Sequence, residues 1–363
     1  MIIEFVPIEY YTSLYYHVLF IICLIVFVQH QIMSYSKQNL SNFKLLGVFL
    51  LCFVILYMGL RPVSGRYFGD MATYATKFNQ AVQNLYEMPD KDVAFSYFII
   101  YSSKIMTLQT FFLLCAMLYV IPLFICCKKW FKKYWFYAFL MLIGSFSFWA
   151  YGTNGIRNGI ATSIFLLAIC SEKKIFQILL MILSISLHKS MLLPSCGYVF
   201  TWFYNHPKGY FYFWLLSIPL SLALPGFWEN LFAGIFEDER VSYFIEGNVN
   251  DDSFSSTGFR WDFLLYSSIG VFAGWYYIFK KKIQYPIYIN LYNTFLFANA
   301  FWILVIRANF SNRFAYLSWF MLALVIIYPW LKSYFIVNQN KKLGIIILTY
   351  FCFTYFMNVF VYG

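Results

Sequence analysis

Apolar runs long enough to cross a bilayer, which takes roughly 20 helical residues, recur from one end of the chain to the other. Because lipid offers no partner to an unpaired backbone group, such runs predict membrane-spanning helices. We therefore expect an all-α, polytopic integral membrane protein with about 11–12 transmembrane helices. The predicted crossings lie near 10–29, 43–60, 108–127, 134–151, 155–170, 174–190, 191–205, 210–225, 262–279, 285–306, 312–331 and 343–361.

Three stretches of this pattern leave alternatives open. The runs at 155–170 and 191–205 are short for a full crossing, and a bent pair of segments near Pro194 would replace the seventh crossing. The stretch 93–106 is too short to span and carries Lys104, which favours a re-entrant or interfacial helix.

No composition shift divides the chain into soluble domains, so we expect one transmembrane domain over 1–363 with long outer loops near 61–92 and 226–261. In the second loop five apolar residues share one helical stripe. Those residues are Trp228, Leu231, Phe232, Ile235 and Phe236. The stripe predicts a helix lying on the outer membrane surface or covering a cavity, followed by a polar loop at 247–258.

The basic residues predict the orientation of the chain. Short lysine-rich loops face the cytoplasm, and an N-terminus outside places fifteen of the nineteen lysines inside. The same orientation puts all seven arginines, and every acidic residue except Glu172, on the outer side. The net charge of +11 then reports orientation, and we expect no nucleic-acid partner.

Other features of the composition narrow the class of protein. Glu4 and Glu9 precede the first apolar run, where a cleavable signal peptide would carry basic residues. The eight cysteines lie mainly inside the predicted crossings without regular spacing, which is typical of small core residues and not of a disulfide frame or zinc site.

The outward arginines are the first candidates for function. Arginine suits phosphate groups because its planar fork donates paired, charge-assisted hydrogen bonds. Some of these residues are equally well explained as loop solvation or membrane anchors, above all Arg240 in its acidic run. The candidates are Arg61, Arg66, Arg157, Arg240, Arg260, Arg307 and Arg313.

Three of these arginines lie at the predicted start of a helix on the outer side: Arg157, Arg260 and Arg313. The helix dipole already makes that end positive, so a cation there is unfavourable unless an anion compensates it. A helix N-terminus with an added arginine therefore suits a diphosphate. Gly155 and Gly159 beside Arg157 have the GxxxG spacing that permits close approach of another helix or a ligand.

Proton transfer and metal binding have fewer candidates. His188, beside Lys189, ends the sixth crossing on the outer side and is either a proton acceptor or a structural histidine. Asp70 shares a helical face with Tyr74, and a helix-capping role is the alternative for Asp70. Asp90 and Asp92 have the DxD spacing of some metal-using glycosyltransferases, but two carboxylates recur often by chance, and we expect no metal and no cofactor.

Four stretches of the sequence together resemble the EpsG-like branch of the Wzy-type polysaccharide polymerases, which build O-antigen, capsule or exopolysaccharide chains. They are LRPVSGRYFGDMATYATKF (60–78), NGIRNGIATSIFLLAI (154–169), SISLHKSMLLP (184–194) and NRFAYLSWF (312–320). The resemblance implies a membrane glycosyltransferase architecture of the GT-C-like kind. It nominates Arg61, Asp70, Tyr74, Arg157, His188 and Arg313 as site residues. Met71 and Asn158 depart from the family's pattern, which bears on substrate contacts more than on the reaction class.

The resemblance and the charge pattern together imply a metal-independent, inverting glycosyltransferase at the outer face of a bacterial plasma membrane. The donor would be a glycan on undecaprenyl diphosphate and the acceptor a lipid-linked repeat unit, with a chain-length regulator and a flippase as further partners. We expect Arg157 with Arg313, and with Arg260 or Arg307, to bind the diphosphate. Arg61, Arg66 and Lys189 would line the same site.

The catalytic candidates are then His188, Asp70 and Arg157, with His188 and Asp70 competing for the role of base. Two other classes stay open. A flippase or other transporter for lipid-linked oligosaccharide would also need arginines, but would carry charges along its path through the membrane. An O-antigen ligase-type glycosyltransferase would use nearly the same chemistry with a different acceptor.

Overall fold

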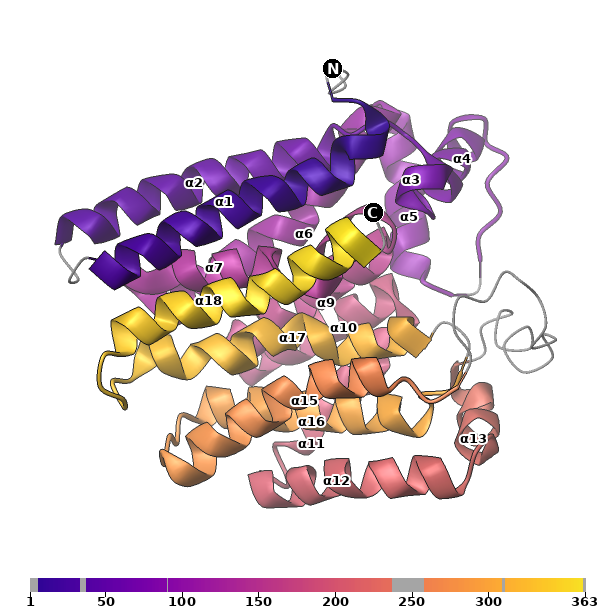
Figure 1. The fold of residues 1–363 in the computed structure, drawn as a ribbon. Coiled ribbons are helices and arrows are strands. Elements are labelled where there is room, and N and C mark those ends of the chain that lie inside the picture. The colour runs from indigo at the N-terminus through magenta and orange to yellow at the C-terminus, as the bar shows by residue number, and fades with distance from the viewer. Residues whose placement is uncertain (1–5, 33–36, 90, 237–257, 309–310, 362–363) are drawn as a thin grey trace. The chain divides into compact units, whose positions relative to one another are not determined.

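The computed structural model describes residues 6–32, 37–89, 91–236, 258–308 and 311–361. Over these ranges the chain is helical and contains no strand (Figure 1). It divides into two compact units, one of residues 1–188 with 330–363 and one of residues 189–329. Each unit is described by itself below.

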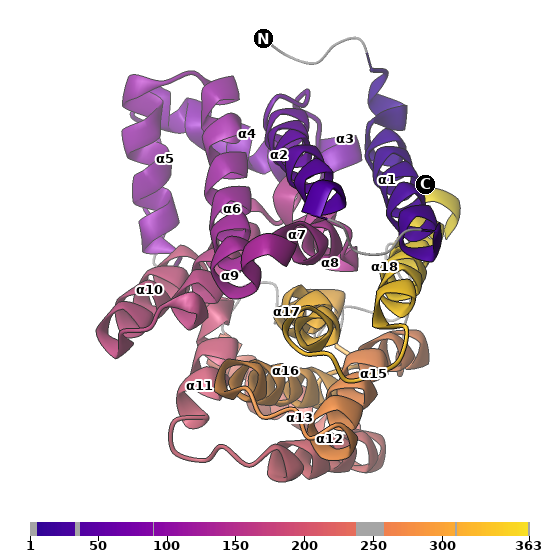
Figure 2. The same ribbon diagram turned by 90° about the vertical axis from the view of Figure 1, so that its left-hand side faces the viewer.

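The first unit joins residues 1–188 to the last helix of the chain. α1 lies along α18, although the two are about as far apart in sequence as the chain allows (Figure 2). The antiparallel helices α9 and α10 pack together, and α6 packs against α2 and α9. The helices are α1 (Tyr11–Ile32), α2 (Lys37–Gly59), α3 (Gly65–Phe68), α4 (Met71–Val82), α5 (Val93–Ile105), α6 (Leu108–Phe131), α7 (Trp135–Ile143), α8 (Phe146–Thr153), α9 (Ile156–Cys170), α10 (Lys174–Leu187) and α18 (Gln339–Phe356).

The second unit is built around α16, which packs against α12 and α11. Its helices are α11 (Leu192–Phe200), α12 (Pro207–Ala223), α13 (Phe227–Phe236), α15 (Trp261–Trp275), α16 (Pro286–Leu304) and α17 (Ser311–Lys332). The predicted amphipathic helix after Pro225 is α13. Its Trp228 donates to the backbone oxygen of Leu220 at 3.1 Å, and its Phe232 contacts the Phe301 ring, so these two side chains pack on their own unit, whereas Leu231 is exposed.

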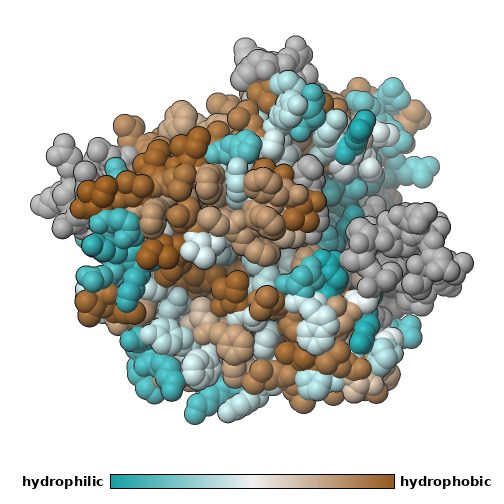
Figure 3. All heavy atoms as spheres, in the orientation of Figure 1, coloured by the Kyte–Doolittle hydropathy of each residue, from teal (hydrophilic) through white to brown (hydrophobic). Residues whose placement is uncertain are grey.

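The protein is a multi-pass membrane protein. Five described stretches are long and apolar enough to cross a bilayer: Ile8–Ile32, Leu108–Ile143, Pro286–Leu304, Ser311–Lys332 and Gln339–Val361. Hydrophobic side chains cover the face over α1 and α2 (Figure 3), where Ile21 on α1 and Phe49 on α2 are exposed. In water such a surface would be unfavourable, whereas lipid accepts it. The total of 11–12 crossings stays a prediction.

Most predicted segments contain a helix, but two differ: the predicted crossing 191–205 holds only the nine-residue α11, and the run 134–151 is divided. The apolar run 134–151 is divided into α7 and α8 at Gly144 and Ser145. A side-chain carbon added at Gly144 would lie 2.8 Å from the Phe351 ring, so α18 packs directly over the break. Every residue of α7 is buried, which makes this segment part of the core of the first unit.

The lysine-rich connections of the first unit gather at one end of its helices. Gln31 donates a hydrogen bond of 3.0 Å to the Lys341 backbone oxygen, and Lys129 forms an ion pair of 3.3 Å with Glu172. Lys132 is close enough to Lys332 for their like charges to repel each other. The candidate site described next lies at the opposite ends of α6 and α9, as the predicted separation of lysines from arginines requires.

Candidate functional site

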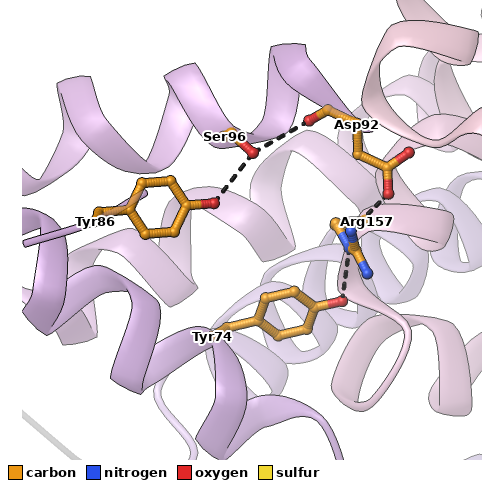
Figure 4. Close-up of polar contacts among 5 residues, drawn as sticks. All are labelled: Tyr74, Tyr86, Asp92, Ser96 and Arg157. Carbon is orange, nitrogen blue, oxygen red and sulfur yellow. Dashed lines mark hydrogen bonds and ion pairs between the residues drawn. The ribbon is translucent and has the colours of Figure 1, made fainter. Parts of the chain in front are cut away.

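The first turn of α9 carries Arg157, which forms the centre of a polar cluster in the first unit (Figure 4). Its Nη1 lies 2.5 Å from Oδ2 of Asp92, and its Nε donates to the Tyr74 hydroxyl at 3.3 Å. Asp92 and Tyr74 lie on opposite sides of the guanidinium group. The side chain of Asp92 is 9% exposed and that of Arg157 27%, so this ion pair is mostly shielded from water while one part of the arginine remains accessible.

Asp92 has an unusual backbone conformation and does not cap the helix that follows it. Asp92 precedes α5 with a left-handed backbone (φ 55°), and its carboxylate does not cap the helix. Its backbone oxygen instead accepts from Ser96 at 3.4 Å, and Ser96 accepts from Tyr86 at 3.1 Å. An aspartate before a helix normally caps it, so the carboxylate of Asp92 gives up local bonding for its ion pair with Arg157.

Asp70 reaches the same cluster from the turn before α4. Its backbone N–H donates to Oδ1 of Asn154 at 2.8 Å, and its carboxylate does not cap α4. Asp70 is near enough to Arg157 and Tyr74 to act on both electrostatically. The preceding Gly69 has a φ of +53°, and an added side-chain carbon would lie 2.5 Å from Oδ1 of Asn154. Glycine is therefore required for the two segments to meet.

The Tyr74 hydroxyl stays protonated at neutral pH. Burial raises the pKa of Tyr74 above 10, and the neighbouring Arg157 charge only partly opposes this effect. Tyr74 can therefore hold and orient Arg157, whereas a role as the base that takes a proton from substrate does not suit it.

Arg61 holds the segment that leads into this cluster, and its side chain is only 1% exposed. Its guanidinium donates to the backbone oxygens of Met58 and, at 3.0 Å, Thr153, the final residue of α8. Burial lowers the pKa of Arg61 to about 10, so it remains charged at neutral pH. Because carbonyl oxygens at helix C-termini carry partial negative charge, they stabilise this buried cation. Arg61 thereby fixes the chain directly before Asn154 and Arg157.

The close approach predicted from the GxxxG spacing is confirmed at Gly159. A side-chain carbon there would lie 2.7 Å from the Tyr151 backbone oxygen, so the end of α8 lies directly against the start of α9.

His188 follows α10, at the level of Arg157. The Ser184 hydroxyl of α10 donates to the backbone oxygen of Ala161 on α9 at 2.7 Å, which fixes the register of this antiparallel pair. One helical turn onward from Ser184 is His188, and one turn back from Ala161 is Arg157. His188 is half-buried and its backbone N–H bonds to Ser184. The helix pair thus brings two predicted catalytic residues to the same end of the first unit.

The second unit holds three further predicted arginines, Arg260, Arg307 and Arg313. Arg260, before α15, forms a two-point ion pair with Asp262, with distances of 2.9 and 2.6 Å. Arg307 donates to the backbone oxygen of Ser221 at 2.7 Å and lies over the ring of Phe259, the residue that precedes Arg260. Arg313 is exposed in the first turn of α17 and interacts with its neighbours. Their predicted convergence with Arg157 on one diphosphate stays a prediction.

The other predicted positions contribute less geometry. Arg66 on α3 is exposed and lies over the Tyr67 ring, and Lys189 is half-buried after α10. Asp90, Arg240 and the loop 247–257 lie outside the described residues. Within the described ranges, no three histidine, cysteine or acidic residues are grouped to hold a metal ion.

The sequence does not reveal the roles of two residues of the site. Asn154 lies in the motif 154–169 and joins that motif to Asp70. The DxD spacing of Asp92 is typical of a metal ligand, whereas its carboxylate pairs with Arg157. An arginine at the start of a helix predicts a nearby anion, and this signal could have found Asp92. Arg157 and Arg260 both pair with an aspartate of the protein itself.

Comparisons with known proteins place the chain in a family. A search among curated proteins found no match, and a search among solved structures found none either. The model of the EpsG family matches residues 44–363, a stretch that includes every residue of the Arg157 cluster and all seven arginines of the chain. That stretch is most of the 363-residue chain, and the protein therefore belongs to the EpsG family.

Proposed function

We propose that this protein is a polysaccharide polymerase of the bacterial plasma membrane. It joins undecaprenyl-diphosphate-linked oligosaccharide repeat units at the outer face by inverting glycosyl transfer. The growing glycan on its lipid diphosphate is the donor, and a fresh lipid-linked repeat unit is the acceptor. Membership in the EpsG family supports the polysaccharide class of reaction.

The observation that carries the proposal is the meeting of two separate motifs at the head of α9. Residues 60–78 contribute Asp70 and Tyr74, and residues 154–169 contribute Arg157. The contacts of Asp70 with Asn154 and of Tyr74 with Arg157 join these motifs across more than eighty positions of sequence. They bring together a cation that can face a leaving diphosphate and a carboxylate that can accept a proton, which are the two tasks of glycosyl transfer from a diphosphate.

In this proposal each group has a separate task. A hydroxyl of the acceptor sugar attacks the anomeric carbon of the donor, the bond to the lipid diphosphate breaks, and the diphosphate leaves. Arg157 stabilises the negative charge that develops on the leaving diphosphate, and its orientation is kept by Tyr74. Asp70 or His188 accepts the proton of the attacking hydroxyl. Attack from the face opposite the leaving group inverts the anomeric carbon.

Arg260, Arg307 and Arg313 are proposed as further diphosphate-binding residues, and Arg66 and Lys189 as further contacts to anionic parts of the substrates. For Arg61 the proposal changes. Since its guanidinium is buried against backbone oxygens, we assign it a positioning role for the segment before Arg157.

The reaction is tested with the purified protein in lipid nanodiscs and a lipid-linked repeat unit as sole substrate. A ladder of longer lipid-linked glycans, with one undecaprenyl diphosphate released for each bond formed, is expected. The new linkage should have the anomeric configuration opposite to that of the donor. Chelators should leave the rate unchanged.

Other outcomes of the same experiment contradict the proposal. Movement of intact substrate between leaflets without new glycosidic bonds would indicate a transporter. Transfer of glycan only after adding a different lipid or protein acceptor would indicate a ligase. Retained anomeric configuration would exclude single-step displacement.

A further inference from the structure

The charges around Arg157 do not suit a diphosphate as they stand. Asp92 and Asp70 give the cluster two formal negative charges against the single positive charge of Arg157. A diphosphate arriving there would be repelled by Asp92 at short range. The Asp92 side chain is only 9% exposed, so little water is present to weaken this repulsion. Like charges a few ångströms apart repel strongly where water is scarce.

The hydrogen bonds of Arg157 lead to the same conclusion. Paired recognition of a phosphate needs two neighbouring N–H groups of the guanidinium fork. In the structure Nε is bonded to Tyr74 and Nη1 to Asp92 (Figure 4), so one donor on each side is already engaged. The Tyr74 bond is the longer, but Tyr74 is neutral and buried and does not oppose an anion. Asp92 is the group that both repels an anion at short range and occupies Nη1, so its departure lowers the repulsion and frees one side of the guanidinium group.

Asp92 is also placed so that it can withdraw. It stands at the junction between the 83–92 connection and α5, and its carboxylate does not cap that helix. Its left-handed backbone costs an aspartate free energy, and the ion pair with Arg157 offsets that cost.

We infer that Asp92 is an internal counter-anion for Arg157, exchanged for the diphosphate of the lipid-linked donor during each catalytic cycle. In the empty protein Asp92 occupies Arg157 and keeps it ordered. The diphosphate displaces the carboxylate on binding, and the return of Asp92 to Arg157 helps to expel the undecaprenyl diphosphate product. This role rests on the proposed function, and it makes Asp92 a positioning residue that sets both substrate affinity and product release.

Binding of inorganic diphosphate to the purified full-length protein in nanodiscs tests the exchange. Asp92→Asn keeps the shape of the side chain and removes the competing charge, so it should tighten binding about tenfold. The matched control is Glu87→Gln, which removes the same charge from an exposed position on the same connection and should change affinity less than twofold. Unchanged or weaker binding by Asp92→Asn would overturn the exchange.

Steady-state polymerisation provides a second readout that a purely structural role would not move in the same way. Asp92→Asn should lower the KM for the lipid-linked donor and lower kcat, because the product leaves more slowly. A purely structural role predicts a lower kcat with a KM that is unchanged or higher, and that result would also overturn the inference.

Hydrogen–deuterium exchange on the unsubstituted protein keeps the test independent of how Asp92→Asn folds. Adding inorganic diphosphate should speed exchange of the amides at 92–96, because Asp92 is released from Arg157. Slower or unchanged exchange there would contradict the displacement. If Arg157→Lys binds diphosphate as tightly as the unsubstituted protein, the proposed function of Arg157 fails first, which separates the two claims.

Discussion

Arg157 owes its position to three different side chains. Asp92 balances its charge, the Tyr74 hydroxyl accepts from its Nε, and Arg61 fixes the end of α8 that leads into α9. Only one of these partners carries a charge that opposes an anionic substrate. The partners therefore differ in what their removal should do.

Tyr74→Phe should slow polymerisation about fivefold while leaving thermal stability nearly unchanged. The ring stays in its buried position, and only the hydroxyl that accepts from Arg157 is lost. Initial rates and a melting curve on the same preparation check this. A rate equal to that of the unsubstituted protein would show that Tyr74 does not orient Arg157.

Gly69→Ala should destabilise the protein by more than the roughly 1–2 kcal/mol expected for a left-handed alanine. The added carbon would also push Asn154 away from the Asp70 backbone. Gly226→Ala is the matched control, because Gly226 also has a positive φ but its added carbon meets no atom within 4 Å. Thermal unfolding compares the two, and equal losses would show that the contact with Asn154 contributes nothing.

Among the helices, those of the second unit are joined by a fully buried polar network. Asn299 on α16 accepts from Trp214 at 2.7 Å and donates to Ser267 and Ser318 at 3.0 and 2.9 Å. These contacts connect α16 with α12, α15 and α17. Since lipid-exposed helices gain little from hydrophobic burial, such bonds specify which helices pack together.

Asn299→Ala should therefore destabilise the second unit by roughly 2 kcal/mol, the sum of three membrane hydrogen bonds. Thr294→Val is the control on the same helix. Thr294 is equally buried, but its hydroxyl bonds only to the Asn290 backbone of its own helix, so its loss should cost little. Thermal unfolding of the two variants checks the difference, and a milder effect for Asn299→Ala would remove the network from the account.

The positions of the helices could largely be predicted from the sequence, because each apolar run must form its own backbone hydrogen bonds in lipid. The predicted stretch 93–106 corresponds to α5, and the amphipathic stripe after Pro225 corresponds to α13. The break between α7 and α8 could not be predicted, because it depends on Phe351 from the far end of the chain packing over Gly144. The pairing of Arg157 with Asp92 was hidden for the same reason, since it joins residues 65 positions apart.

Considered as a whole, the first unit has two chemically different ends. Lysines gather where α6 ends and α10 begins, and the Arg157 cluster lies where α9 begins. The charge rule for membrane orientation then predicts that the lysine end faces the cytoplasm and the Arg157 end faces outward.

Cysteine labelling in intact cells tests this orientation. A cysteine at Arg66 should react with a membrane-impermeant reagent, and one at Lys341 only after the membrane is opened, in a background where the exposed Cys52 and Cys196 are replaced. Reaction of the Lys341 position in sealed cells would invert the topology and exclude an outward-facing site at Arg157.

The central claim is that the charge of Arg157 drives release of the lipid diphosphate. Replacing Arg157 alone would leave the shielded Asp92 carboxylate without its arginine counter-charge, so the informative variant is Arg157→Gln combined with Asp92→Asn. The measurement is kcat/KM for polymerisation by this purified double variant. We predict a loss of about a hundredfold or more, with a melting temperature close to that of the unsubstituted protein. Polymerisation at the unsubstituted rate would contradict the account.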